Sequence, residues 1–184
     1  TKNPEEKPYF LTNQSAGSFN TFKHSFEAGT GKFLNNLLSV SARYSIINSD
    51  GYIDRAFSKL NSYNINALFE KGNTKLRFLT FGGKEKTYQA WNGIDKATYE
   101  SNPKFNYSGA IYDANWENII GFYDNETDNY RQNHYHLLWE QKLGKIWNLE
   151  TTFHLTHGEG YYENYKQDAK FSKYDLPNIV ENGN

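Results

Sequence analysis

Within the stretch from residue 37 to residue 47, positions 38–46 alternate strictly between apolar and polar side chains, and this pattern restricts the fold more than any other feature. A period of two residues is typical of a β-strand whose two faces meet different surroundings, whereas a helix would spread the apolar groups around its circumference. Because an unpaired buried guanidinium costs several kcal/mol, the face that carries Arg43 must be wet or paired. The two expected faces are Leu38, Val40, Ala42, Tyr44 and Ile46 on one side, and Ser39, Ser41, Arg43 and Ser45 on the other.

The same alternation recurs along most of the chain, interrupted by segments rich in Gly, Asn and Asp that favour turns. The pattern therefore predicts an all-β, antiparallel up-and-down meander of about seven or eight strands in one domain spanning 1–184. The expected strands are 9–15, 22–29, 37–47, 58–70, 75–83, 129–142 and 147–158. A long irregular region, 84–128, separates the fifth strand from the sixth and is expected to form an outer loop.

Composition limits the class of protein. The 184 residues carry a formal net charge of -1 with no basic cluster, which argues against nucleic-acid binding. Cysteine is absent, so disulfides and thiol chemistry are excluded. There is also no apolar run of about 18 residues, the length that a transmembrane helix requires. A membrane-spanning barrel stays open as an interpretation, because its short alternating strands give only a weak hydropathy signal.

Two regularities favour such a barrel. Charge on a lipid-facing strand position costs about 2–4 kcal/mol near the membrane midplane, and the mid-strand charges all fall on the polar face of their strands. They are Lys23, Glu27, Arg43, Arg77, Glu140 and Glu150. Short and long connections also mostly alternate, as on the two rims of an outer-membrane barrel. Phe69, Trp139 and Trp147 lie at the short-turn ends, where an interfacial aromatic girdle would be. A soluble β-sandwich with one wet face explains the alternation equally well.

Several stretches resemble the TonB-dependent receptors of Gram-negative outer membranes. They are T-K-N-P (1–4), S-A-R-Y-S-I-I-N-S-D-G-Y-I-D-R-A (41–56), F-G-G-K-E-K-T-Y-Q-A-W-N-G (81–93), D-N-Y-R-Q-N-H-Y (128–135) and H-G-E-G-Y-Y-E-N-Y-K (157–166). The first resembles the exit from the plug domain, and the others resemble barrel strands and their loops. A full member of the family has about 22 strands around a plugged lumen.

The resemblance implies that this chain is the first part of a receptor barrel, with the TonB box and plug expected to lie outside it. The parent protein is then expected in the bacterial outer membrane, in contact with lipid, driven by the TonB system through its N-terminal part, and importing a scarce ligand. Siderophores, haem, cobalamin and glycans belong to that ligand class. On this interpretation the chain is not an enzyme, and Arg43, Arg77 and Glu150 are expected to face the lumen and the plug.

The candidate binding residues fall into three groups, each with a plainer interpretation. Loop aromatics would bind a ligand or would pack on one another: Tyr88, Trp91, Tyr112 and Trp116. The histidines His134, His136 and His154 would bind a metal ion or would be water-bonded lumen residues. Alternate carboxylates, Asp124, Glu126 and Asp128, would hold calcium on the outer loop or would form a solvated turn. No other cofactor is expected.

Two rival functions follow from the sequence. The first is a soluble β-sandwich module that binds a ligand, with carbohydrate as the natural partner for the aromatic loop. The second is a fragment of a secreted glycosidase, which requires two carboxylates about 5–10 Å apart across a cleft. Neither G-x-S-x-G nor H-E-x-x-H occurs, and no pattern in the sequence brings such a carboxylate pair together.

Overall fold

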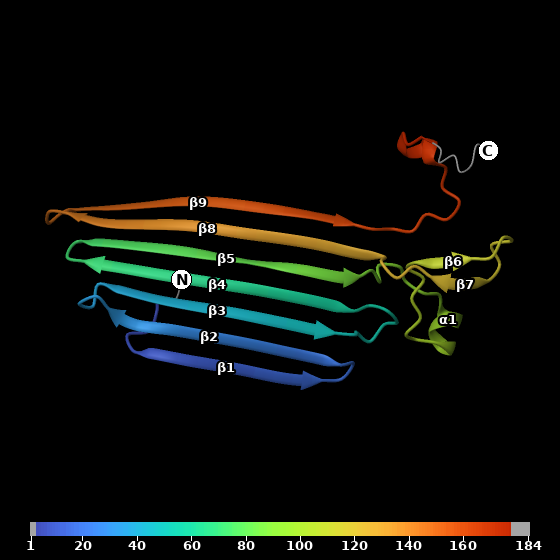
Figure 1. Ribbon diagram of the computed structural model, residues 1–184, viewed down its shortest axis with the longest axis horizontal. Helices are drawn as coiled ribbons and strands as arrows, with labels where there is room; N and C mark the ends of the chain where they lie inside the picture. Colours follow the sequence, from blue (N-terminus) through green and yellow to red (C-terminus); the bar gives the residue numbers. More distant parts are fainter. Residues whose placement is uncertain (1–2, 178–184) are drawn as a thin grey trace.

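The computed structural model describes residues 3–177, which form one long sheet with a smaller loop region beyond one end of it (Figure 1). The strands of the main sheet are β1 (Pro8–Gly17), β2 (Thr21–Phe33), β3 (Leu38–Ser49), β4 (Ser58–Lys71), β5 (Thr74–Tyr88), β8 (Thr127–Leu143) and β9 (Trp147–Tyr162). The remaining elements are α1 (Lys96–Ser101), β6 (Ala110–Tyr112), β7 (Ile119–Phe122) and the 3-10 helix η1 (Phe171–Tyr174).

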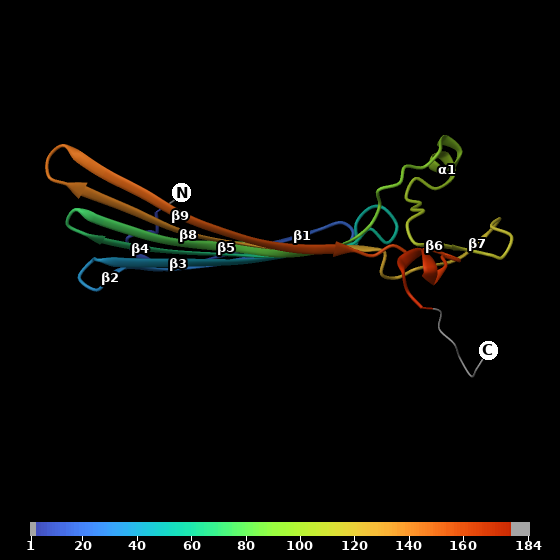
Figure 2. The same ribbon diagram turned by 90° about the horizontal axis from the view of Figure 1, so that it is seen from above.

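The seven strands follow one another as an antiparallel meander in the order β1-β2-β3-β4-β5-β8-β9. The predicted all-β meander is therefore confirmed. The sheet is open: among the described residues β1 and β9 each have a single neighbouring strand and do not pair with one another. Figure 2 shows the sheet as a single twisted layer, with β6, β7 and α1 beyond the ends of the long strands rather than stacked on a sheet face.

The strands run farther than the alternation predicted. The prediction that β5 ends at Gly83 is wrong, because β5 pairs with β8 as far as Tyr88 and β8 begins at Thr127. The prediction that the second strand ends at Gly29 is also wrong. At that point β2 carries a β-bulge, and the chain turns back only after Phe33. A bulge and a turn look alike in sequence at this point, because each can place a glycine with a positive φ in a polar stretch. Here Gly31 has the positive φ, and it belongs to the bulge.

The two sheet faces differ as the alternation predicted. One face, which we call the apolar face, carries exposed hydrophobic side chains on every strand. They are Phe10, Phe22, Phe26, Phe33, Tyr44, Ile65, Phe78, Tyr135, Leu137, Trp139, Leu143, Trp147, Leu149, Phe153, Leu155 and Tyr161. The opposite face, the polar face, holds the buried Ser25, Ser39, Ser45, Asn66 and Arg77 together with Leu68 and Leu79.

A conventional hydrophobic core is missing from the described part of the chain, where Leu68, Leu79 and Tyr88 are the buried hydrophobic residues. The long strands are instead held by their ladders of backbone hydrogen bonds and by polar contacts between side chains. The most deeply buried side chains, Asn106 and Thr127, lie where the strands meet the loop region. Helices of the length and hydropathy needed to cross a membrane do not occur in residues 3–177.

Candidate functional sites: the polar face and the loop region

Arg43 lies on the polar face, as predicted, and its charge is held by hydroxyl groups. Its Nε donates to Ser25 Oγ at 3.1 Å on β2 and to Ser45 Oγ at 3.3 Å on its own strand. Ser45 Oγ in turn donates to Ser25 Oγ at 3.0 Å. Ser25 of β2 and Ser45 of β3 therefore accept hydrogen bonds from the exposed side chain of Arg43, which meets the expectation that this guanidinium is wet or paired.

The segment that precedes β1 crosses the polar face. The Lys32 N–H on β2 donates to the Glu6 carbonyl at 2.9 Å, and Gly31 (φ +65) leaves room because a Cβ there would lie 2.7 Å from Glu6 O. Three strands away, the guanidinium of Arg77 on β5 donates to the side-chain oxygen of Asn3. Arg77 is only 6% exposed. The segment thus spans from β2 to β5 across the face that the predicted lumen residues occupy.

Glu150, the third predicted lumen residue, lies on β9 opposite Glu140 of β8. Both carboxylates line a hollow of about 310 Å³ at the short-turn end of the sheet. Lys75 on β5 approaches Glu140 at 3.7 Å, an exposed ion pair that contributes little stability. Arg43, Arg77 and Glu150 therefore share the polar face but form three separate environments.

The long connection between β5 and β8 is a packed unit and not an irregular loop; we call residues 89–126 the loop module. Asn106 is 1% exposed, and its side-chain nitrogen donates to the carbonyls of Asp54 at 3.1 Å and Gln89 at 2.9 Å. Arg55 places its guanidinium 3.5 Å from the centre of the Phe122 ring and donates to the Asn106 carbonyl. The β3–β4 connection is thereby fastened to the module.

The four predicted loop aromatics do not form one surface. Tyr88 is buried at the end of β5, where its hydroxyl donates to the Tyr123 carbonyl at 2.7 Å, and burial raises the pKa of this phenol. Trp91 is exposed, and its ring contacts Tyr162 edge-on. Tyr112 and Trp116 alone make a joint surface, with stacked rings whose centres are 5.7 Å apart.

A groove of about 610 Å³ lies beside the Tyr112–Trp116 stack. Its other wall is the segment after β9, held by a reciprocal amide contact: Gln167 Oε1 accepts from the Tyr112 N–H at 2.7 Å, and Gln167 Nε2 donates to the Tyr112 carbonyl at 2.9 Å. That wall adds Tyr165, Lys166, Lys170, Lys173 and Tyr174. The sequence-based prediction missed these residues, because their partners in β6 lie more than fifty positions earlier.

The three predicted calcium ligands do not share one site, and one of them has a structural role. Glu126 is buried, and its two carboxylate oxygens accept from Asn164 Nδ2 and from the Tyr165 N–H, each at 2.7 Å. This carboxylate fastens the segment after β9 to the loop module. Within residues 3–177 the side chains of Asp124, Glu126 and Asp128 are not gathered into a cluster of metal-ligand atoms. Calcium at this position remains a prediction from the sequence.

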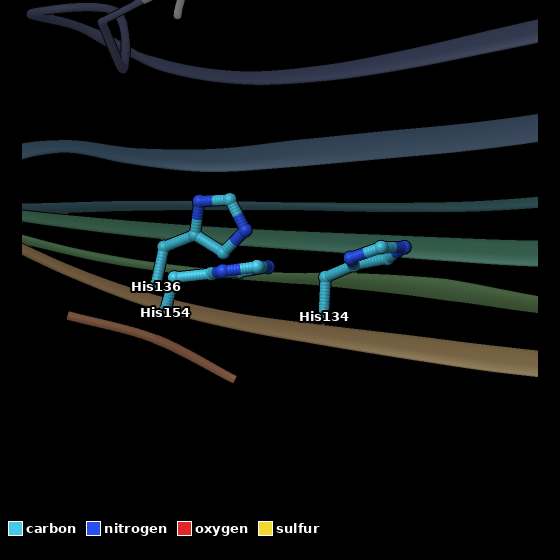
Figure 3. A group of neighbouring side chains, drawn as sticks. All are labelled: His134, His136 and His154. Carbon is cyan, nitrogen blue, oxygen red and sulfur yellow. The ribbon is translucent and has the colours of Figure 1, made fainter. Parts of the chain in front are cut away.

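The three predicted histidines are brought together on the polar face (Figure 3). His134 and His136 alternate along β8, and His154 lies directly opposite His136 on β9. One ring nitrogen from each comes within 4.8 Å of the others. The spacing of two residues and the strand register together produce this cluster, because β-strand side chains two apart share a face.

No model of a known protein family matches the sequence. No curated protein matches it either.

Proposed function

We propose that this chain forms part of the wall of a TonB-dependent outer-membrane receptor, which imports a scarce ligand such as a siderophore, haem, cobalamin or a glycan. The observation that carries the proposal is the separation of chemistry between the two sheet faces. Exposed aromatic and aliphatic side chains cover the apolar face, whereas Arg43, Arg77, Glu140 and Glu150 all lie on the polar face.

The apolar face is too large to be left to water. Full burial of one large hydrophobic side chain is worth about 1.5–3 kcal/mol. Even partial burial of the residues on this face would yield an amount comparable to the whole stability of a domain, about 5–15 kcal/mol. The length of the apolar stretch along the strands favours lipid as the material that covers this face. On β9 the apolar side chains extend from Trp147 to Leu155, roughly 27 Å along the strand at about 3.4 Å per residue.

A tilt of about 35–45° reduces that length to a height of roughly 19–22 Å, which fits within the apolar band of about 25 Å of outer-membrane barrels. Beyond this band on the same face come Lys84, Arg131 and Glu159, neighbours in the register of β5, β8 and β9. These charges lie at the ends of the strands that lead into the loop module, where a membrane surface would end. At the opposite end of the sheet, Lys71 lies on the same face beside the β4–β5 turn. Trp147, beside the β8–β9 turn, marks the opposite boundary, whereas Trp139 lies opposite Thr151, midway along the band, and not at the short-turn end where the sequence placed it.

The polar face supports a role as lumen wall. In the proposed receptor, the segment containing Asn3 and Glu6 would lead from the plug across the lumen to the first strand. Its contacts with Lys32 and Arg77 support this route. The groove beside Tyr112 and Trp116 lies at the end with the longer connections, which would face outward. Stacked rings and nearby lysines would suit capture of an anionic or ring-containing ligand there.

The mass of the 184-residue chain in solution tests the proposal. Light scattering with and without detergent is expected to give assemblies in water and a defined protein–detergent particle in micelles, because the apolar face and both sheet edges require covering. A monodisperse monomer in water would contradict the proposal and would favour the soluble binding module, whose apolar face is covered internally.

A further inference from the structure

We propose that His134, His136 and His154 form a binding site for one divalent transition-metal ion of the zinc, nickel and copper group. The site does not depend on the proposed receptor function, because it requires only the register between β8 and β9. Its three imidazoles come from adjacent strands on the polar face, and their ring nitrogens already lie within 4.8 Å of one another.

The ring geometry shows how the cluster is arranged. The rings of His136 and His154 have centres 4.9 Å apart and planes at 76°, so that one ring edge points at the other ring. The ring of His134 is nearly parallel to that of His154, with centres 6.4 Å apart. For a tetrahedral ion with bonds of about 2.0–2.1 Å, the nitrogens must approach to roughly 3.3 Å. Because the hydrogen-bond ladder between β8 and β9 fixes the backbone positions, the proposed site requires the side chains to supply this movement.

An unpartnered nitrogen points independently to a ligand. The Nε2 atom of His136 is buried and has no hydrogen-bond partner among the described residues. A buried polar atom without a partner costs about 1–3 kcal/mol. A metal ion accepting the lone pair of His136 Nε2 would remove that cost.

The other two rings are already joined through one atom. The hydroxyl of Thr156 lies 2.8 Å from His154 Nε2 and 2.9 Å from His134 Nδ1. Both nitrogens therefore aim at the same point on the polar face, as they would at a shared ion or at a water bound to it. The Thr156 hydroxyl occupies that point, but it makes no hydrogen bond to His136 Nε2.

An aromatic side chain of the neighbouring strand packs against the cluster. Phe81 on β5 stacks against His134, with ring centres 4.6 Å apart and planes at 15°, and it also contacts the ring of His136. The register places Leu79 opposite His136. One side of the cluster is thus an apolar wall, while His154 remains exposed on the other side and leaves a path for an ion from solvent.

The donor set selects the class of metal. Three neutral imidazoles suit zinc, nickel and copper, whereas calcium and magnesium require oxygen ligands, and the cluster contains no carboxylate. Copper(II) is expected to bind most tightly in the usual order of divalent affinities. Three protein ligands leave a fourth position open for water or an incoming donor.

The test is a titration of the folded chain in detergent with Zn²⁺, Ni²⁺ and Cu²⁺ separately, followed by calorimetry, with Co²⁺ absorption as a report on tetrahedral nitrogen coordination. We expect one ion per chain. His154→Ala and His136→Gln should each weaken binding at least tenfold, and the exposed position of His154 makes its replacement harmless to folding. Circular dichroism of each variant checks that the sheet persists.

His157→Ala is the matched control, because His157 lies on β9 three residues from His154 but on the opposite face. His24→Ala on β2 is a second control. Both should bind as the unaltered chain does. The proposal is overturned if none of the three ions binds saturably, if His154→Ala and His136→Gln bind normally, or if His157→Ala loses affinity to the same degree.

Discussion

The hydroxyl of Tyr63 on β4 donates a 3.0 Å hydrogen bond to Oδ1 of Asn133 on β8, across the intervening strand β5. The residue between them in the register is Gly82. A Cβ at that position would lie 2.4 Å from the Gln132 carbonyl oxygen and 2.6 Å from Asn133 Oδ1. The bridge over β5 therefore exists because Gly82 has no side chain.

Replacing Gly82 with alanine is expected to destabilise the chain by about 1–3 kcal/mol, the usual cost of forcing an extra methyl group into a filled position. The added carbon meets backbone atoms of β8, so the two strands must separate locally and the bridge must break. The measurement is the free energy of unfolding in urea, with the protein held in detergent micelles.

Two variants separate the causes. Tyr63→Phe removes only the hydroxyl group, with its hydrogen bond to Asn133 and its longer 3.4 Å contact with Thr80 Oγ1, and should cost about 0.5–1.5 kcal/mol. Gly93→Ala is the matched control, because a Cβ at Gly93 meets no atom within 4 Å. If the Gly82→Ala chain were as stable as the unaltered chain, the close approach of β5 and β8 at Gly82 would be contradicted.

Charge introduced at adjacent positions of β9 should have opposite consequences on its two faces. Phe153 lies on the apolar face and is 61% exposed, whereas Thr152 lies on the polar face. Phe153→Lys should weaken insertion into phospholipid vesicles by about 2–4 kcal/mol, the cost of a lysine facing lipid near the midplane. Thr152→Lys should leave insertion unchanged. Vesicle flotation after refolding measures both, and equal insertion of the two variants would contradict a lipid-facing surface.

Arg55 should control the docking of the loop module without controlling the sheet. Arg55→Met removes the contact with Phe122 and the donor to the Asn106 carbonyl. A charge-assisted hydrogen bond is worth about 1.5–3 kcal/mol. Hydrogen exchange of residues 89–126 should therefore quicken about ten- to hundredfold, because each 1.4 kcal/mol is a factor of ten.

Arg131→Met is the control for Arg55, since Arg131 is an exposed arginine on β8. Mass spectrometry of the exchanged peptides reports the loop module and the strands separately. Quickened exchange in β3 and β4 but not in the module would show that Arg55 supports the sheet instead.

The contact between Tyr123 and Glu163 should depend on alkaline pH. The Tyr123 hydroxyl donates to Glu163 Oε2 at 3.1 Å, and this hydrogen bond raises the pKa of the phenol above its ordinary 10.0. Because the folded-state pKa is raised, the stabilisation is complete below the ordinary pKa and is lost as the pH rises through the folded-state value. The contact is thus intact at neutral pH and breaks only in strong alkali.

Ultraviolet titration of tyrosinate measures this shift as the difference between the unaltered chain and Tyr123→Phe. Glu163→Gln should move the midpoint back toward the ordinary value, because it removes the acceptor's charge. An unchanged midpoint in Glu163→Gln would mean that the carboxylate does not cause the shift.

The alternation of β3 was sufficient to predict the meander and the faces, because a period of two places each side chain regardless of distant contacts. Tyr44 and Arg43 lie on the faces that the pattern assigned to them. Strand ends were predicted less well. Gly82 and Gly83 resemble a strand terminus in sequence, but they allow strands to approach closely, and pairing continues to Tyr88.

The candidate sites also differ in how far the local sequence pattern predicts them. The histidine cluster follows from alternation and one hairpin register, so the sequence was enough to bring His134, His136 and His154 together. The groove at Tyr112 depends on Gln167, fifty-five positions later, and on the capture of the segment after β9 by Glu126. Such contacts depend on the tertiary path of a long connection, which local pattern does not encode.

The central claim, that the apolar face meets lipid, is tested most directly by fluorescence quenching along β9. The chain has no cysteine, so single cysteines at residues 151–155 each give one labelling site. With the chain in vesicles containing lipid-attached nitroxides, labels at 151, 153 and 155 should be quenched strongly, and labels at 152 and 154 weakly. Quenching that does not alternate with a period of two residues would contradict the account.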